Sequence, residues 1–200
     1  MRKWLFALDR GSGAERACDA LRRTAYVAEP TDALTAEQMG REPRLQKADG
    51  LIAGWWDTGS ERALPDSHAY RVEEILHWDY ERDWPDGAFS PGVVVFYFVR
   101  RREDLSREEF VRRYREGHAP LARVHHPGIW RYVQNYVLER SPGAPEWDAI
   151  SSLHFHSEED FRERFYRDET SPSIILEDIT RFADLRTGFT LVTRERILTS

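Results

Sequence analysis

The distribution of apolar residues along the chain predicts a series of strands interrupted by short helices. The clearest signal is the stretch from Val93 to Val99, in which every residue is β-branched or aromatic. A run of this length is too short to cross a membrane and is typical of a strand that is buried on both faces. The three arginines at 100–102 follow it and return the chain to solvent. We therefore predict a central, buried strand at 93–99.

A helix with clear start signals is predicted directly after this strand. Ser106 and Glu109 have the spacing of a capping box, in which the serine side chain accepts a hydrogen bond from a backbone N–H of the first turn. Leu105 and Phe110 have the spacing of a hydrophobic staple. Tyr114 lies four residues after Phe110 and continues the same apolar face. We expect this face of the helix to pack on the sheet.

The remaining segments repeat one order of elements. Further strands are predicted at 4–8, 26–28, 50–57, 68–78, 129–139, 147–156 and 187–198. Helices are predicted at 14–25, at 157–165 and from Ser171, which would be the N-cap, with Pro172 as the first helical residue. Each half of the chain therefore follows strand–helix–strand–strand–helix–strand. In the N-terminal half a loop replaces the second helix.

This repeated order predicts two domains in one chain. Residues 1–80 form the N-terminal, degenerate half, and residues 92–200 form the C-terminal half. The connector at 81–91 contains prolines, a glycine, Trp84 and Phe89, so it should pack on the protein. The alternative is a single domain, formed by the C-terminal half, with an irregular N-terminal extension.

The C-terminal half also shows a family resemblance. From Asp104 the chain reads DLSREEFVRRYREGHAPL, and the next strand reads IWRYVQNYVLE. Trp147-Asp148-Ala149-Ile150 follows, and then Glu177-Asp178 with Phe182 and Asp184. Over about residues 92 to 198 these stretches resemble the EthD-like family of the dimeric α/β-barrel superfamily. The resemblance implies an α+β fold of ferredoxin-like βαββαβ units, here two in tandem that form a dimeric-type barrel within a single chain.

Composition and charge exclude several other classes of protein. Of the 200 residues 40% are hydrophobic and seven are tryptophan, which is typical of a globular protein. A net charge of −6 provides no basic surface for nucleic acid. Cys18 is the only cysteine, so neither an intramolecular disulfide nor a cysteine metal cage can form. The apolar N-terminal run is broken by Asp9 and has no signal-peptide pattern, so we expect a soluble, cytoplasmic protein without membrane partners.

His118 is the first candidate for chemistry. Gly117 is expected to end the helix in the left-handed conformation, which would leave His118 on the continuation of the buried face, beside the sheet. A neutral imidazole facing a cavity can exchange protons near neutral pH. The alternative is a helix-end histidine that binds free carbonyl groups and interacts with the helix dipole. The family pattern, in which His-Ala-Pro-Leu recurs, favours a role in a site.

Two histidines on one strand are a second candidate. Leu153 and Phe155 alternate with His154 and His156, so the histidines should share the opposite face with Ser152. A pair at this spacing can bind a metal, but Zn²⁺ would need a third protein ligand, and the sequence suggests none. We therefore expect the two histidines to line a cavity and expect no metal centre.

Asp178 and a group of aromatic residues complete the candidates. Asp178 lies four residues after Ile174 and four before Phe182, within an apolar helical stripe. It is either a carboxylate with a structural partner or, if it meets a histidine, the group that orients a base. Tyr132 and Tyr136 share one strand face with Gln134. Most large aromatic residues belong to cores, but some could line a site for a flat hydrophobic molecule, namely Trp55, Tyr97, Trp130 and Tyr136, together with His156.

The resemblance and the candidate residues together suggest an enzyme. We expect a cofactor-independent acid/base enzyme, namely a cyclase, dehydratase or decarboxylase, that acts on a hydrophobic aromatic or polyketide-derived molecule. His118 would be the acid/base, assisted by Tyr132, His154 or Asp178. The alternatives are a cofactor-independent monooxygenase, which the superfamily also contains, and a non-catalytic binding or accessory protein. The resemblance also leaves a homodimer open.

Overall fold

The computed structural model describes residues 2–9, 26–28, 50–56 and 66–197. The predicted helix at 14–25, with Cys18, lies outside these residues. The strands are β1 (Arg2–Leu8), β2 (Tyr26–Ala28), β3 (Gly50–Trp56), β4 (Ser67–Trp78), β5 (Val93–Val99), β6 (Ile129–Arg140), β7 (Ala149–Phe155), β8 (Phe189–Thr193) and β9 (Glu195–Ile197). The helices are α3 (Arg107–Arg112), the π-helical turn η1 (Arg113–His118), α4 (Ala119–His125), α5 (Glu158–Glu163) and α6 (Ser171–Ile179).

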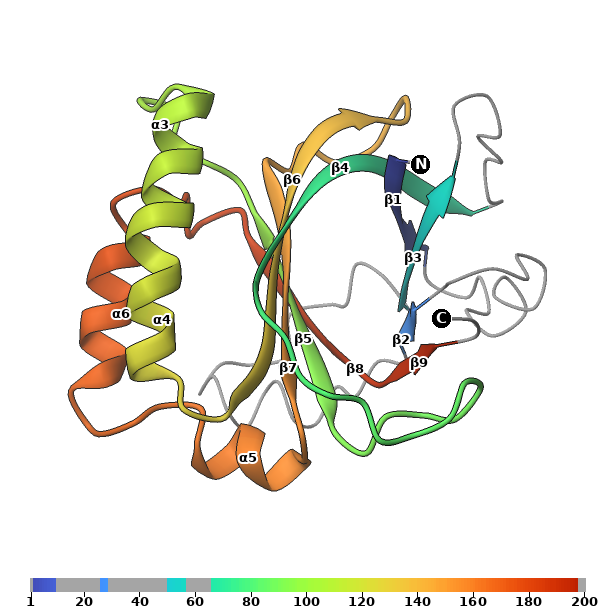
Figure 1. Ribbon diagram of the computed structural model, residues 1–200. Coiled ribbons are helices and arrows are strands. Elements are labelled where there is room, and N and C mark those ends of the chain that lie inside the picture. Colours follow the sequence, from blue (N-terminus) through green and yellow to red (C-terminus); the bar gives the residue numbers. More distant parts are fainter. Residues whose placement is uncertain (1, 10–25, 29–49, 57–65, 198–200) are drawn as a thin grey trace.

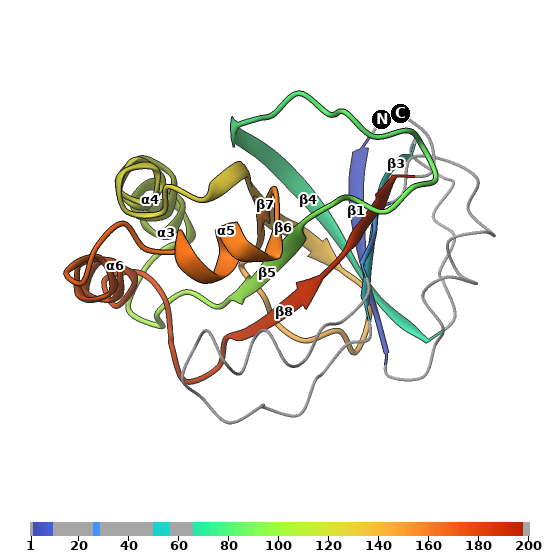
Figure 2. The ribbon, with the colours of Figure 1, turned by 90° about the horizontal axis from the view of Figure 1, so that it is seen from below.

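The described strands form one antiparallel sheet that curls back on itself (Figures 1 and 2). Its order is β8-β5-β7-β6-β4-β1-β3-β2-β9. The two outermost strands, β8 and β9, are successive in the chain and are separated only by Arg194. The predicted closing strand at 187–198 is thus split in two, and its halves pair with opposite edges of the sheet. The chain itself therefore joins the two edges into a barrel.

Each half of the sheet has the strand order of a ferredoxin-like unit. In the N-terminal half the order is β4-β1-β3-β2, and in the C-terminal half it is β8-β5-β7-β6. Both orders place the fourth strand of the unit beside the first, then the third, then the second. The halves join where β4 pairs with β6 and where β2 pairs with β9. This order confirms the α+β fold with two ferredoxin-like units in one chain, whereas the domain limits 1–80, 81–91 and 92–200 remain a proposal.

The segment between β4 and β5 covers the outer edge of β9. The backbone N–H of Gly87 donates to the Ile197 carbonyl at 2.7 Å, and that of Ser90 donates to the Glu195 carbonyl at 2.8 Å. Tyr80 of the same segment stacks on Trp130, with ring centroids 4.1 Å apart. The segment therefore packs as predicted and protects a strand edge that would otherwise be open to pairing.

The core lies on both faces of the C-terminal half of the sheet. Residues 94, 96 and 98 of β5 point into the barrel, where they meet apolar side chains of β1, β3 and β4. Val93 and Val95 point to the other face, which α4, α5 and α6 cover. Because both faces of β5 are buried, its sequence is continuously apolar, and this strand is confirmed with the predicted limits.

The helix after β5 begins as the sequence predicts. Ser106 is the N-cap, and its Oγ accepts a hydrogen bond from the Glu109 backbone N–H at 3.1 Å. The Glu109 carboxylate does not return to Ser106 but pairs with Arg112 and Arg113. Leu105 packs against the cluster that contains Phe110, as a hydrophobic staple requires.

The prediction that Gly117 ends this helix is wrong. Only Gly87 and Gly143 have a positive φ among the described glycines, and the helical path continues to His125. At η1 the helix widens, so that the Ala119 N–H donates to the Tyr114 carbonyl five residues earlier. We attribute the wide turn to Pro120, which has no N–H to donate and whose ring would collide with the carbonyl four residues before it in a regular α-helix. His118 is consequently a mid-helix residue, which excludes the helix-end alternative.

The start of α6 also differs from the prediction by one residue. Thr170 is the N-cap, and Ser171 is the first helical residue. The Ser171 backbone N–H and Oγ both donate to Asp168 Oδ1, at 3.0 and 2.9 Å, so an aspartate before the helix satisfies its first N–H groups. Within the described residues, no helix has the length and apolar character that a membrane span requires.

Candidate active site

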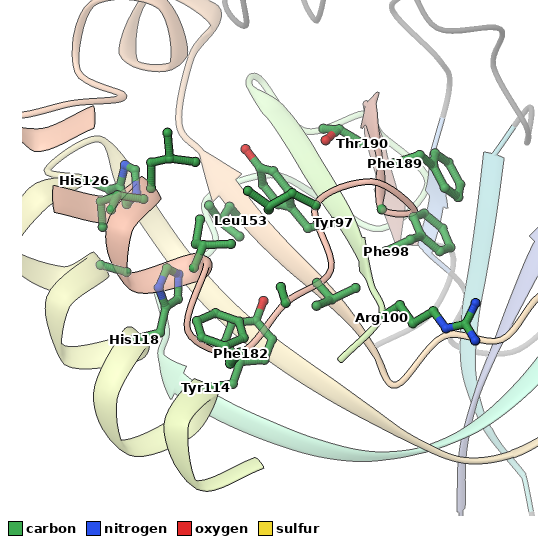
Figure 3. A pocket seen from close by; sticks show the side chains of 18 of the residues that line it. Tyr97, Phe98, Arg100, Tyr114, His118, His126, Leu153, Phe182, Phe189 and Thr190 are labelled. Atoms are coloured by element: carbon green, nitrogen blue, oxygen red, sulfur yellow. The ribbon is translucent and has the colours of Figure 1, made fainter. Parts of the chain in front are cut away.

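A cavity of about 210 Å³ lies between the helices and the outer face of the C-terminal half of the sheet (Figure 3). Its floor is formed by β5 and β8, and its walls are formed by η1, α4 and α6. The lining is mainly aromatic and aliphatic. The residues that could exchange protons or hydrogen bonds with a ligand are Tyr97, Arg100, Tyr114, His118, His126, Tyr132, Tyr166, Asp184 and Thr190.

His118 and Asp178 meet at the wall of this cavity. His118 comes from the wide helical turn and Asp178 from the last turn of α6, and His118 Nδ1 lies 2.9 Å from Asp178 Oδ2. Because an ionised carboxylate can only accept, Nδ1 carries the hydrogen, and in the neutral ring Nε2 carries the lone pair. Nε2 has no hydrogen-bond partner among the described residues. The pair thus has the geometry of a base oriented by a carboxylate.

The surroundings of His118 fix its ring. Its centroid lies 5.4 Å from that of Tyr114 and 5.4 Å from that of Phe182. The His118 side chain is only 9% exposed. Figure 3 shows the three rings grouped on one side of the cavity. An imidazole held by two rings and a carboxylate is positioned before any ligand binds, which is what a catalytic base requires.

Tyr132, predicted as an assisting residue, lines the same cavity. Its hydroxyl accepts a hydrogen bond from Gln134 Nε2 at 2.8 Å, and Tyr136 donates to Gln134 Oε1 at 2.6 Å. Tyr114 donates to Ser151 Oγ at 2.8 Å. Burial raises the pKa of Tyr132 well above its usual value and also raises the pKa of Tyr114. These hydroxyls therefore stay protonated and form a polar, uncharged wall beside His118.

His126, the C-cap residue of α4, also lines this cavity, and it is not among the candidates from the sequence. Its Nδ1 donates to the Phe165 carbonyl oxygen. Burial lowers the pKa of His126 to about 4, so its ring is neutral at neutral pH. The signal that could have found it is its spacing, since His126 follows His118 by eight residues, or about two helical turns. The incorrect helix end at Gly117 concealed that relation.

His154 lies on the other face of the sheet, inside the barrel. Its Nδ1 is 3.6 Å from Glu195 Oε2, and its Nε2 is 3.4 Å from a terminal nitrogen of Arg131. Burial lowers the pKa of His154 more than the neighbouring Glu195 raises it. The space beside it is about 20 Å³, roughly enough for one water molecule. The structure therefore separates His154 from His118, contrary to the grouping that the sequence suggested.

The predicted substrate-binding residues divide in the same way. Tyr97 lines the large cavity. Tyr136 is buried beneath the helix, where its hydroxyl donates a hydrogen bond to Gln134 Oε1. It lies behind the cavity wall and is not a lining residue. Trp130 stacks on Tyr80 and meets the edge of His156, which is exposed beyond β7. Trp55 lies in the N-terminal half, with the Lys3 ammonium 5.2 Å from its ring centroid.

His154 and His156 have the sequence spacing of a pair that could share a metal ion. Their rings lie apart, one inside the barrel and one on Trp130. Within the described segments, no three His, Cys, Asp or Glu side chains come close enough together to hold a metal ion.

The architecture and the site define the class of protein. A curled sheet of two ferredoxin-like units, with helices over a cavity, is the fold of the dimeric α/β-barrel superfamily, and solved structures share it. An anthrone oxidase-like protein aligns with a TM-score of 0.60 and 13% identity, covering 98% of this chain and 92% of that chain. A candidate monooxygenase from Lactobacillus acidophilus NCFM aligns with a TM-score of 0.52 and 8% identity, covering 99% and 96%. A major regulator of staphylococcal pathogenesis aligns with a TM-score of 0.55 and 11% identity, covering 96% and 98%.

A family match lies in the C-terminal half. Residues 102–186 match the family model of the EthD domain. The match contains both members of the His118–Asp178 pair and confirms the resemblance on which the sequence analysis relied. No curated protein matches the chain. The structural neighbours, at these low identities, establish the fold alone.

Proposed function

We propose that this protein is a cofactor-independent acid/base enzyme that abstracts a proton from a hydrophobic aromatic or polyketide-derived molecule. The observation that carries the proposal is the His118–Asp178 pair at the wall of a 210 Å³, mainly apolar cavity. A buried imidazole whose Nδ1 is oriented by a carboxylate, and whose Nε2 has no partner among the described residues, is suited to general base catalysis. A flat apolar molecule is suited to a cavity lined by Tyr97, Phe165 and Phe182.

The proposed step uses residues of this chain only. His118 Nε2 takes a proton from an acidic C–H or O–H of the substrate, and the Asp178 carboxylate stabilises the imidazolium that results. The substrate anion can then attack a carbonyl carbon within the same molecule, lose a hydroxyl group or lose carbon dioxide. In each case His118 returns the proton, to the new alkoxide, to the leaving hydroxyl or to the carbon that lost the carboxyl group. The enzyme would therefore be a cyclase, a dehydratase or a decarboxylase.

The test is exchange of solvent deuterium into a panel of anthrones and aryl β-diketones, followed by NMR. This exchange reports proton abstraction without requiring the final reaction to be known. His118→Gln keeps an amide that can donate to Asp178 but has no base, and it should slow exchange by about 10²- to 10⁴-fold. His125→Gln is the matched control, because His125 lies on the same helix but bonds to Ser171 Oγ at 2.9 Å outside the cavity lining.

In this test an unchanged exchange rate in folded His118→Gln would refute the proposal, as would equal losses in both variants. The thermal midpoint of each variant should be measured on the same preparations. If His118 is the base, the midpoint of His118→Gln should change little, because the substitution removes no large apolar volume.

The names of two structural neighbours, an anthrone oxidase-like protein and a candidate monooxygenase, favour a second candidate, a cofactor-independent monooxygenase. The same base would form the substrate anion, which would then react with molecular oxygen as the co-substrate. Oxygen uptake that depends on the substrate and on His118 separates this candidate from a lyase or cyclase. Tight ligand binding without exchange, turnover or oxygen uptake would instead indicate a binding or accessory protein.

A further inference from the structure

We infer that the cavity selects a flat, fused-ring aromatic molecule with a hydroxyl group at the end remote from His118, and that His126 accepts a hydrogen bond from this hydroxyl. The inference rests on the proposed function, to which it adds a class of substrate and a specificity-determining residue.

The first support is a strip of three residues along one helix face. His118, Ala122 and His126 follow one another at intervals of four residues, and all three line the cavity. The His126 N–H donates to the Ala122 carbonyl at 2.9 Å, so the helical spacing extends to His126. At 1.5 Å per residue the two histidine Cα atoms are about 12 Å apart along the helix axis. Figure 3 shows the two rings at different positions along the same cavity wall.

The second support is the shape between the two histidines. Ala122 presents only a methyl group there and is 1% exposed. Across the cavity lie Tyr97 and Leu153 from the sheet, with Ile175 and Ile179 from α6. These side chains offer apolar surface and no charge. A cavity lined here by a small residue and by mainly apolar side chains suits a flat ring system of two or three rings.

The third support is the chemistry of His126. Because Nδ1 donates to the Phe165 carbonyl, Nε2 carries a lone pair in the neutral ring. Nε2 has no partner among the described residues, although the residue is only 5% exposed. The lowered pKa, about 4, keeps the ring neutral and accepting at neutral pH. Phe165 and Tyr166 hold the ring, with centroids at 4.8 and 5.1 Å.

The Nε2 atoms of His118 and His126 are hydrogen-bond acceptors at the two ends of an apolar cavity, and they determine which ligands can bind. A ligand with a hydroxyl donor opposite His126 satisfies Nε2. A ligand with a carbonyl, carboxylate or ether there places acceptor against acceptor and leaves Nε2 unpaired. Leaving a buried polar atom without a partner is costly, so discrimination should exceed what a single added hydrogen bond would give.

The experiment compares two probes by titration calorimetry, 2,6-dihydroxynaphthalene and 2,6-dimethoxynaphthalene. They share the ring system, but only the first can donate. We expect the wild-type protein to bind the dihydroxy compound at least about 10-fold more tightly. His126→Asn retains a group that can donate to the Phe165 carbonyl but lacks Nε2, and it should reduce this preference to about twofold. His126→Gln, whose longer amide can place an oxygen near the Nε2 position, should retain most of it.

Ala122→Leu is the second, independent variant, because it fills the space between the histidines and leaves both in place. It should weaken both probes by about 10-fold or more. The inference is overturned if the wild-type protein shows no preference between the probes, if His126→Asn weakens both equally, or if Ala122→Leu affects neither. Should His126→Asn fail to fold, the wild-type preference and the effect of Ala122→Leu decide the question.

These binding measurements do not depend on turnover. Preference for the dihydroxy probe with normal exchange in His118→Gln would leave the inference intact and refute only the proposed function. If deuterium exchange depends on His118 but the wild-type protein binds both probes equally, the proposed function stands and the inference about His126 is refuted.

Discussion

Two buried histidine–carboxylate pairs occur in the described part of the chain, and they differ chiefly in what surrounds them. His118 and Asp178 join two helices above the sheet, beside a cavity of about 210 Å³. His154 and Glu195 lie inside the barrel, beside a space of about 20 Å³. The Asp178 side chain is 18% exposed, whereas that of Glu195 is 2% exposed. The first pair can meet a ligand, and the second has room for little more than a water molecule.

The comparison shows that the residue types alone do not define the site. Inside the barrel the Glu195 carboxylate faces His154 and also accepts from the Tyr80 hydroxyl at 3.1 Å, while Lys3 pairs with Glu74 nearby. Such a network ties strands of both halves together. Above the sheet, His118 has one carboxylate partner and one free nitrogen beside the cavity. We therefore expect the two pairs to respond to mutation in opposite ways.

The largest effect should come from Asp178→Asn. An asparagine can present its amide nitrogen to His118, which would favour the wrong tautomer and remove the charge that stabilises the imidazolium. In triads of this kind the analogous change lowers turnover by about 10⁴-fold, and we expect a loss of about 10²- to 10⁴-fold in the deuterium exchange rate. Glu177→Gln, at an exposed neighbouring ion pair with Arg181, should change exchange by less than about twofold. Equal exchange in both variants would contradict a role for the pair.

Glu195→Gln should have the converse effect. Removing one charge of a buried network leaves Arg131 less well compensated, and such changes cost about 3 to 5 kcal/mol in the free energy of unfolding. Urea denaturation measures the loss, while the exchange rate of the folded variant should stay near that of the wild type. Glu158→Gln, which breaks an exposed pair with Arg194, is the control and should cost less than about 1 kcal/mol. A stable Glu195→Gln protein with lost exchange would reverse the assignment of the two pairs.

A pH effect of similar or smaller size should arise from His126. Its pKa is about 4 in the folded state and about 6.5 in the unfolded chain, so the unfolded chain binds the proton more tightly. Stability is therefore complete above about pH 6.5 and falls as the pH is lowered towards the folded pKa. The loss from this residue is about 3 kcal/mol by pH 4.

The measurement is urea denaturation of the wild type and of His126→Asn at several pH values. The variant should be less stable at neutral pH, and its stability should fall less between pH 6.5 and 4. Parallel curves for the two proteins would show that His126 does not titrate in this way.

The smallest effect should come from removal of metal ions. Neither pair has a third histidine, cysteine or carboxylate ligand nearby within the described segments. Exhaustive chelation should therefore leave the exchange rate and the thermal midpoint unchanged. A bound transition metal at a stoichiometric level, lost together with exchange, would contradict this expectation and would make one of the pairs a ligand set.

Much of the fold could be predicted because its signals are local. The limits of β5 follow from a continuous apolar run, and the start of α3 follows from Ser106 and Glu109. The predicted helix end at Gly117 is wrong because it rests on a local rule, that a glycine often ends a helix in the left-handed conformation. Here the chain widens by one residue and continues. A local rule cannot foresee this outcome, which depends on the packing of the same helix against the sheet and α6.

The candidate site could be predicted in part. His118 and Asp178 were found separately, one from the family pattern and one from its place in an apolar stripe. Their contact spans 60 residues of sequence, so no local spacing could establish it. His126 was missed, and His154 was grouped with His118 although it faces the opposite side of the sheet. The alternation of β7 shows that Leu153 and His154 face opposite ways, but not which of the two faces lies under the helices.

The sequence by itself therefore indicated most of the described elements, their repeated order and the resemblance of the C-terminal half to the EthD domain, because hydrophobic periodicity, capping residues and a recurring motif are properties of neighbouring residues. Only the tertiary structure decided which histidine meets a carboxylate beside open space and which is sealed inside the barrel. That choice depends on how the two sheet halves close through β8 and β9 and on how α4 and α6 pack over one face. Access to a cavity is a property of the whole packed chain.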